Sequence, residues 1–169
     1  MKINSQLSAL NSQLRKGFTL IELLVVITII ATLAVTVFVA LNPGQRLKDA
    51  KDARRTSDVD TILTAIHASI VDTKGTSPAG LSTLEQQLGT GATGCGITNT
   101  TSGCAVTAVS CLNLSSPLAK YLKSMPIDPS GAATYTDAKT GYSAIQDSNG
   151  LVTVRACGSE GTVGILSSR

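Results

Sequence analysis

The sequence predicts an α+β protein in which a long N-terminal hydrophobic helix packs on a small C-terminal antiparallel β-sheet. Residues 18–41 are an almost unbroken apolar block, and residues 42–73 continue with apolar side chains at three- and four-residue steps, the period of a helix. The last third of the chain alternates apolar and polar residues on both sides of an Asn-Gly pair, which is a hairpin signal. A helical first half followed by short strands indicates segregated α and β elements.

The composition limits the size of the core. The chain has 169 residues, of which 43% are hydrophobic but only 3% aromatic, with no Trp. Since much of the apolar content lies in residues 18–41, few large side chains remain for a globular part, and a small domain of that kind often needs covalent staples. The net charge of +3 comes from Lys2, Arg15 and Lys16, because removing these three from the 14 Lys and Arg leaves 11 against 11 Asp and Glu. This balance argues against a nucleic-acid-binding surface.

Four cysteines, Cys95, Cys104, Cys111 and Cys157, follow the apolar block. An even number in a small, aromatic-poor domain indicates disulfides and an oxidising compartment. A zinc site is the weaker interpretation, since no CxxC pair occurs and the one histidine, His67, lies far upstream. Of the three possible connectivities we expect Cys95–Cys104, which would close a Gly-rich loop, and Cys111–Cys157.

The apolar block is long enough to cross a membrane. As a helix its 24 residues would extend about 36 Å, against a hydrocarbon core of roughly 30 Å. A secretory signal peptide would have a shorter apolar stretch and a small-residue cleavage site after it, and neither is present. A plain membrane anchor would have no use for Glu22, the single ionisable residue of the block.

The junction before this block runs Arg15-Lys16-Gly17-Phe18-Thr19-Leu20-Ile21-Glu22. It resembles the prepilin family, the type IV pilins and the pseudopilins of type II secretion, in which a short basic leader ends in Gly and an apolar run begins with Phe and has Glu in fifth place. The resemblance implies that residues 1–17 are a leader, cut between Gly17 and Phe18 by a prepilin peptidase, and that the new Phe18 amine is methylated. It also implies that Glu22 is an assembly contact.

The same resemblance implies a pilin fold, with a membrane and filament-core helix over residues 18–41, an amphipathic continuation over 42–73 and a globular head over 74–169. The expected product is a homo-oligomeric helical filament made by a pilus assembly machinery. Its subunit would wait in the cytoplasmic membrane as a precursor and end at the cell surface. Adhesion, motility and DNA uptake are roles that such filaments serve.

One observation conflicts with that orientation. Five basic residues follow the span, namely Arg46, Lys48, Lys51, Arg54 and Arg55, and they outnumber those of the leader. The positive-inside rule alone would place this end in the cytoplasm. The cleavage motif and the downstream cysteines favour the opposite orientation.

The amphipathic helix over 42–73 has an apolar stripe and a polar face that carries Asp52, Arg55, Asp58 and other charges. Because acids and bases alternate on this face, we interpret it as solvated and linked by salt bridges. Asn42-Pro43-Gly44 predicts an end or a kink between the two helical segments.

In the head, residues 79–116 read as a loop-rich region, with a short helical pattern at Leu81, Leu84 and Leu88. We expect a short helix over 112–123. Strands are predicted over 142–146 and 151–156, joined by Asp147-Ser148-Asn149-Gly150, and further short strands over 132–136 and 162–166.

The sequence contains no Gly-x-Ser-x-Gly, P-loop or HExxH pattern, so an enzyme is disfavoured and no cofactor is expected. Asp137, Asp147 and Asn149 could bind calcium, but Asp and Asn also favour turns, and no EF-hand spacing is present. Two other functions stay open. One is a type II secretion pseudopilin, and the other is a single-span anchored binding protein that does not polymerise.

Overall fold

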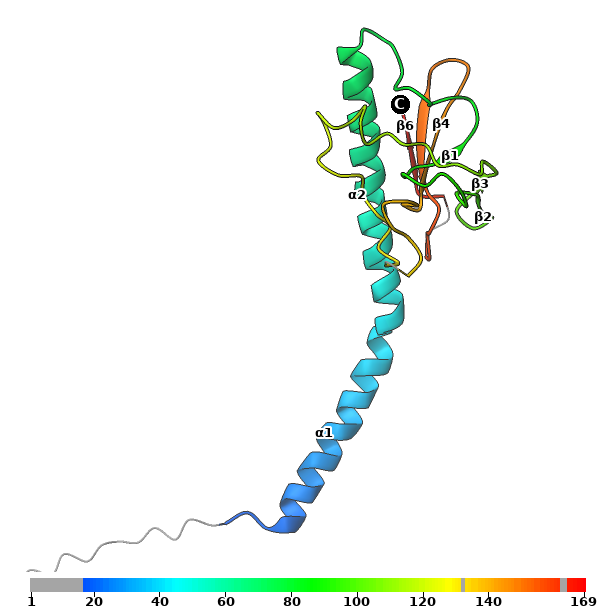
Figure 1. Cartoon of the computed structure of the whole chain (residues 1–169). Coiled ribbons are helices and arrows are strands. Elements are labelled where there is room, and N and C mark those ends of the chain that lie inside the picture. The colour runs from blue at the N-terminus through cyan, green and yellow to red at the C-terminus, as the bar shows by residue number, and fades with distance from the viewer. Residues whose placement is uncertain (1–16, 132, 162–163) are drawn as a thin grey trace, which may run out of the picture. The chain divides into compact units, whose positions relative to one another are not determined.

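The computed structural model describes residues 17–131, 133–161 and 164–169, and divides into two compact units, Met1–Asn42 and Pro43–Arg169 (Figure 1). We describe each unit by itself. The first contains α1 (Leu20–Leu41). The second contains α2 (Pro43–Asp72), β1 (Gln86–Gln87), β2 (Ile97–Asn99), β3 (Cys104–Val106), β4 (Tyr142–Gln146), β5 (Val152–Ala156) and β6 (Leu166–Ser168).

The helical segments are interrupted where the sequence predicts. Asn42 caps α1 in the left-handed conformation, with φ of 40°, and its N–H donates to the carbonyl of Val39. Asn tolerates this conformation better than most residues. Pro43 is the first residue of α2, a position where its missing N–H costs little.

The main sheet has four antiparallel strands in the order β1–β4–β5–β6. The predicted hairpin over residues 142–156 is confirmed as β4 and β5, with Gln146 opposite Val152. Its turn depends on the Asp147 carboxylate, whose Oδ1 accepts hydrogen bonds from the backbone N–H groups of Asn149 at 2.9 Å and Leu151 at 2.8 Å. This is turn chemistry of the kind that Asp provides.

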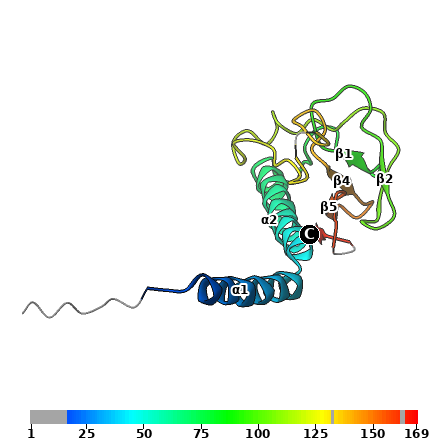
Figure 2. The ribbon, with the colours of Figure 1, turned by 90° about the horizontal axis from the view of Figure 1, so that it is seen from below.

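The core of the second unit lies between α2 and this sheet. Helix α2 packs on β5 and β6, and one of its faces buries Val59, Ile62, Leu63 and Ile66 (Figures 1 and 2). Strand β5 alternates in register with the pleat and turns Val152, Val154 and Ala156 inward. The predicted α+β class, with helix on antiparallel sheet, is therefore confirmed.

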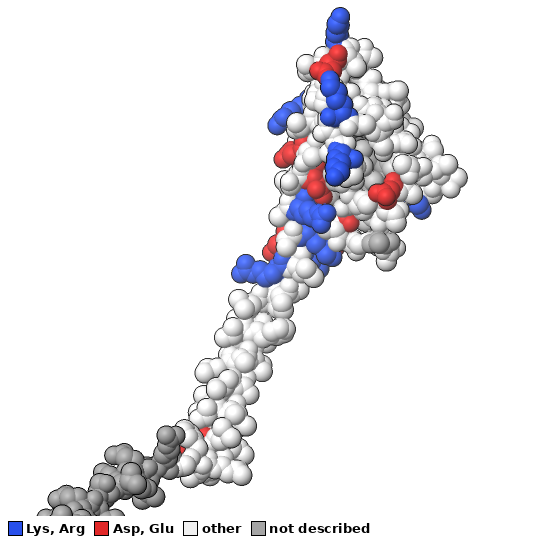
Figure 3. Space-filling view, turned by 60° about the vertical axis from the view of Figure 1, so that its left-hand side comes forward, with Lys and Arg blue, Asp and Glu red and all other residues white. Residues whose placement is uncertain are grey.

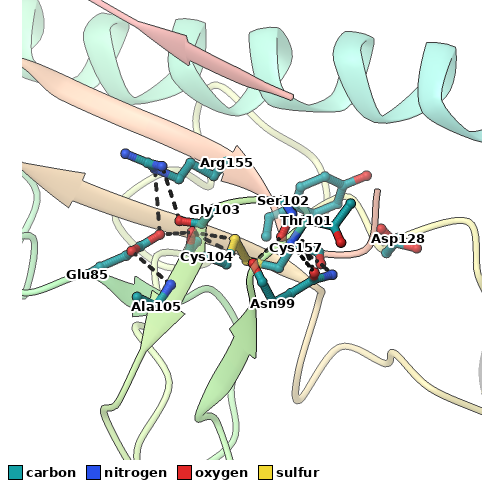
Figure 4. The surroundings of a disulfide bond; sticks show 12 residues. Glu85, Asn99, Thr101, Ser102, Gly103, Cys104, Ala105, Asp128, Arg155 and Cys157 are labelled. Atoms are coloured by element: carbon teal, nitrogen blue, oxygen red, sulfur yellow. Dashed lines mark hydrogen bonds and ion pairs between the residues drawn. A yellow bond between two sulfur atoms is a disulfide. The ribbon is translucent and has the colours of Figure 1, made fainter. Parts of the chain in front are cut away.

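The second sheet is the β2–β3 hairpin, which lies on the side of the main sheet turned away from α2 (Figures 1 and 4). Two disulfides hold it, and they join Cys95 to Cys111 and Cys104 to Cys157. The expected pairing of Cys95 with Cys104 and of Cys111 with Cys157 is wrong.

The register of the hairpin explains the observed pairing. Cys104 lies opposite Asn99, the last residue of β2, and Asn99 is four residues after Cys95 in the sequence. At about 3.3 Å per residue this separation is about 13 Å, whereas a disulfide requires Cα atoms within about 7 Å. The N–H of Cys95 donates instead to the carbonyl of Val109 at 3.0 Å, which places Cys95 beside Cys111 with 5.2 Å between their Cα atoms.

Polar contacts also tie this hairpin to the main sheet (Figure 4). The side-chain amide of Asn99 donates to the carbonyl of Cys157 at 2.8 Å, and the guanidinium of Arg155 donates to the carbonyl of Gly103 at 3.2 Å. The Glu85 carboxylate accepts from the Ser143 hydroxyl at 2.6 Å and faces Arg155 at 3.8 Å. The hairpin is thus fixed to β4 and β5 through both covalent and polar links.

Some predicted elements are absent from the described part of the chain. The helix expected over residues 112–123 is absent, and residues 115–121 form successive turns, because Pro117 lacks the N–H that a helix needs and disfavours helical geometry at Ser116. The leucine pattern over 81–88 predicts a short helix, but this segment contains the strand β1 instead. Residues 133–136 contain no strand. The last strand begins at Leu166 instead of 162, and residues 132, 162 and 163 lie outside the described residues.

The sequence predicts a solvated polar face on α2, but part of this face is buried. Arg55 is 0% exposed, and its guanidinium donates to both carboxylate oxygens of Asp128, at 2.7 and 2.8 Å, to Asp52 at 2.6 Å and to the Ser130 hydroxyl at 2.7 Å. Asp128 is also buried and comes from a loop 73 residues away. The interpretation as a solvated face is therefore wrong for Asp52 and Arg55.

The loop after β5 closes over this buried ion network. Asp52 accepts a hydrogen bond from the N–H of Gly161 at 2.7 Å, and Lys51 pairs with Glu160 at 3.0 Å. A Cβ on Gly158 would lie 2.5 Å from an Asp128 carboxylate oxygen, so the close approach requires glycine there. Burial alone would raise the pKa of Asp128, but the hydrogen bonds from Arg55 and Ser130 outweigh it and hold that pKa below its ordinary value.

Removing the buried guanidinium should destabilise the fold strongly. Arg55→Ala leaves Asp52 and Asp128 buried without their cation, which we expect to cost about 3–5 kcal/mol of unfolding free energy. The matched control is Arg54→Ala, since Arg54 is exposed and faces Asp58 at 3.7 Å, and it should cost less than about 1 kcal/mol. Urea unfolding of the full chain in detergent, followed by circular dichroism, measures both. Equal effects of the two substitutions would show that the network contributes no more than an exposed pair.

The disulfide assignment has a chemical test. Non-reducing peptide mapping should recover Cys95 linked to Cys111 and Cys104 linked to Cys157. Because no Lys or Arg lies between Lys74 and Lys120, trypsin cannot separate three of these cysteines, and a protease that cuts at small apolar residues is needed. Replacing Cys104 and Cys157 by Ala should cost about 4 kcal/mol, against about 3 kcal/mol for the shorter loop of the other pair. A peptide joining Cys95 to Cys104 would refute the assignment.

Candidate processing and assembly segment

Helix α1 begins with a reciprocal capping box. The Thr19 hydroxyl accepts from the backbone N–H of Glu22 at 3.2 Å, and the Glu22 carboxylate accepts from the N–H of Thr19 at 2.9 Å and from its hydroxyl at 2.8 Å. Such a box satisfies backbone donors that would otherwise be unpaired at a helix start. Sequence reasoning missed this role of Thr19, although the spacing Thr-x-x-Glu is its recognised signature.

The surface of α1 is apolar and uncovered. None of its residues is buried against the described part of the chain, and its most apolar 18-residue window has a mean hydropathy of 2.9. The hydroxyls of Thr28, Thr32 and Thr36 donate to backbone carbonyls three residues earlier at 2.8–2.9 Å. Since these hydroxyls are satisfied within the helix, they do not oppose its transfer into lipid.

Charged side chains are concentrated on the second unit (Figure 3). Over residues 20–41 the single ionisable side chain is Glu22, whereas Lys, Arg, Asp and Glu recur throughout α2 and the head. The predicted assembly residue, Glu22, is therefore the single ionisable side chain of an apolar helix and lies in its first turn. A carboxylate in that position is costly in lipid unless it is hydrogen-bonded or paired.

The predicted cleavage junction is accessible. Gly17 and Phe18 precede α1 in non-helical backbone, and Phe18 is 82% exposed. A Cβ built on Gly17 meets no described residue within 4 Å, so packing against the described part of the chain does not require glycine there. The rest of the predicted leader, residues 1–16, lies outside the described residues.

The other candidate residues serve the structure of the head. His67 Nε2 lies 3.1 Å from the carbonyl of Arg169, beside β6. Asp147 belongs to the β4–β5 turn, and the carbonyl of Asp137 accepts from the N–H of Thr90 at 3.0 Å. Among residues 17–131, 133–161 and 164–169, no group of three or more His, Cys, Asp and Glu is placed to hold a metal.

Comparison with known proteins identifies the same segment. Residues 13–38 match the family described as the prokaryotic N-terminal methylation motif. No curated protein and no solved structure matches the chain. The matched residues include the Gly17–Phe18 junction, the Thr19 cap, Glu22 and most of α1. The chain therefore carries the prepilin-type signature of type IV pilins and pseudopilins, which indicates a membrane-anchored precursor of a structural protein.

Proposed function

We propose that this chain is the precursor of a structural subunit of a type IV pilus-like filament. A prepilin peptidase removes residues 1–17, the Phe18 amine is methylated, and the subunits polymerise through α1. The observation that carries the proposal is an apolar helix that the described residues leave uncovered, with one acidic residue at its start and most of its length within a matched N-terminal methylation motif.

The exposed surface of α1 supports polymerisation on energetic grounds. Sixteen large apolar side chains over residues 18–41 are 45–82% exposed. Their burial is favourable by about 1.5–3 kcal/mol for each fully covered side chain, so the total is on the order of tens of kcal/mol. Lipid provides that cover for the precursor in the cytoplasmic membrane, and neighbouring copies of α1 provide it in the filament. The head domains then face solvent at the cell surface.

The charge of Glu22 gives assembly a register. In the precursor Thr19 satisfies this carboxylate locally. Cleavage after Gly17 creates an ammonium group at Phe18, and a carboxylate and an ammonium attract strongly in an apolar surrounding. We propose that Glu22 pairs with the Phe18 amine of a neighbouring subunit as each subunit is added by the assembly machinery.

Two alternative functions share this N-terminal segment, and experiments have to distinguish them from a pilus subunit. A type II secretion pseudopilin would share the apolar helix and the cleavage motif. A single-span binding protein would remain in the membrane without polymerising.

The processing step predicts a defined mature protein. Filaments sheared from cells should contain a chain that begins at Phe18, carries a methylated amine and lacks residues 1–17. Intact-mass measurement and N-terminal peptide sequencing establish this. A mature chain that retains Met1, or that is cut after Leu41, would exclude the proposed processing.

Glu22→Ala should be inserted and cleaved normally but should enter filaments poorly, because the subunit lacks the charge that pairs with its neighbour's amine. We expect at least a tenfold lower yield of sheared filament, measured by immunoblotting sheared and cellular fractions with the variant as sole subunit. Normal cleavage of the variant shows that the segment is still presented to the peptidase.

Glu22→Gln is the matched control for this experiment. Gln can accept the Thr19 hydrogen bonds of the capping box but has no charge. If the charge sets the register, Glu22→Gln should fail as Glu22→Ala does. A wild-type filament yield from Glu22→Gln would assign the residue to helix capping alone.

A further inference from the structure

The structure sorts the basic residues that follow α1 into two groups. Arg55 is buried between Asp52 and Asp128, Lys51 pairs with Glu160 at 3.0 Å, and Arg54 faces Asp58 at 3.7 Å. These three cations have acidic partners within the chain.

Arg46 and Lys48 differ from these. Both are exposed, and neither makes a salt bridge or side-chain hydrogen bond with any residue that the structure describes. The first turn of α2 has no acidic residue. The nearest acid in the sequence, Asp49, accepts a hydrogen bond from the Gln45 side chain at 2.8 Å. Arg46 and Lys48 are thus two cations near the start of α2 without an acidic partner among the described residues.

Their place in the chain keeps them close to the end of the apolar helix. The 22 residues of α1 extend about 33 Å, against a hydrocarbon core of roughly 30 Å. Pro43 follows α1 after a single residue, and Arg46 and Lys48 lie about 5–8 Å farther along α2 at 1.5 Å per residue. The headgroup layer on each side of the core is about 5–8 Å thick. Whatever the direction of α2, both residues therefore lie within about 12 Å of the end of α1, which is close enough for their long side chains to meet lipid phosphates there.

We propose that Arg46 and Lys48 bind the phosphates of anionic phospholipids in the leaflet from which α2 emerges. The proposal rests on the membrane-inserted precursor of the proposed function. Pairing with lipid phosphates is possible on either side of the membrane. The proposal therefore gives Arg46 and Lys48 a role on the side away from the cytoplasm, where the positive-inside rule does not expect basic residues. Arg presents a fork of donors that matches phosphate, and Lys adds a compact charge.

The test uses the full-length chain in mixed micelles of phosphatidylglycerol and phosphatidylcholine at equal amounts. After affinity purification, mass spectrometry gives the ratio of the two lipids that remain bound. We expect phosphatidylglycerol to be enriched several-fold over its bulk ratio, by about fivefold for each basic side chain at the surface. Arg46→Gln/Lys48→Gln should return the ratio to that of the bulk, and Asp49→Asn should raise it.

The matched control is Lys74→Gln/Lys123→Gln, which removes two exposed cations that lie far along the chain from α1 and make no salt bridge among the described residues. This control should keep the wild-type ratio. Absence of enrichment in the wild type, or equal enrichment in Arg46→Gln/Lys48→Gln, would overturn the proposal. Resistance of every variant to alkaline extraction from membranes tests insertion separately. Loss of insertion would instead contradict the proposed function.

Discussion

The constraint on which this molecule depends is that the described residues leave the apolar helix α1 uncovered. Its apolar side chains run along all sides of the helix, and none is buried within the described residues. A helix that is hydrophobic all round is stable in lipid or inside an assembly, and not in water. Membrane insertion and polymerisation would each remove the apolar surface of α1 from water. The same helix can serve both because its backbone and its three threonine hydroxyls are satisfied internally.

The head has to be stable with few large apolar side chains in its core. Its apolar core is built on one face of α2 and the inward face of β4 and β5. Around that core, two disulfides fix the β2–β3 hairpin, and the Arg55 network joins α2 to the loops that contain Asp128 and Glu160. A buried ion network with satisfied hydrogen bonds favours one arrangement of these loops over others, since removing either partner leaves an unpaired charge.

The elements that could be predicted are those with local periodicity. The two helical segments and the β4–β5 hairpin repeat their pattern over five or more residues, so sequence alone locates them. Strands β1 to β3 have two or three residues each and form only by pairing. The burial of Arg55 and the disulfide connectivity depend on partners distant in the sequence, which no local pattern encodes. The junction motif predicts roles for Gly17, Phe18 and Glu22, and the Thr-x-x-Glu spacing within it also encodes the Thr19 cap.

The central claim is that copies of α1 cover one another in an assembled filament. Electron cryo-microscopy of filaments sheared from cells tests it most directly, with the chain identified in the map by its two disulfides and the side chains of the head. The account predicts a helical assembly in which residues 18–41 lie in the interior, contact other copies and are shielded from solvent, with the heads outside. A filament of this chain in which residues 18–41 face solvent, or are absent from the subunit, would contradict it.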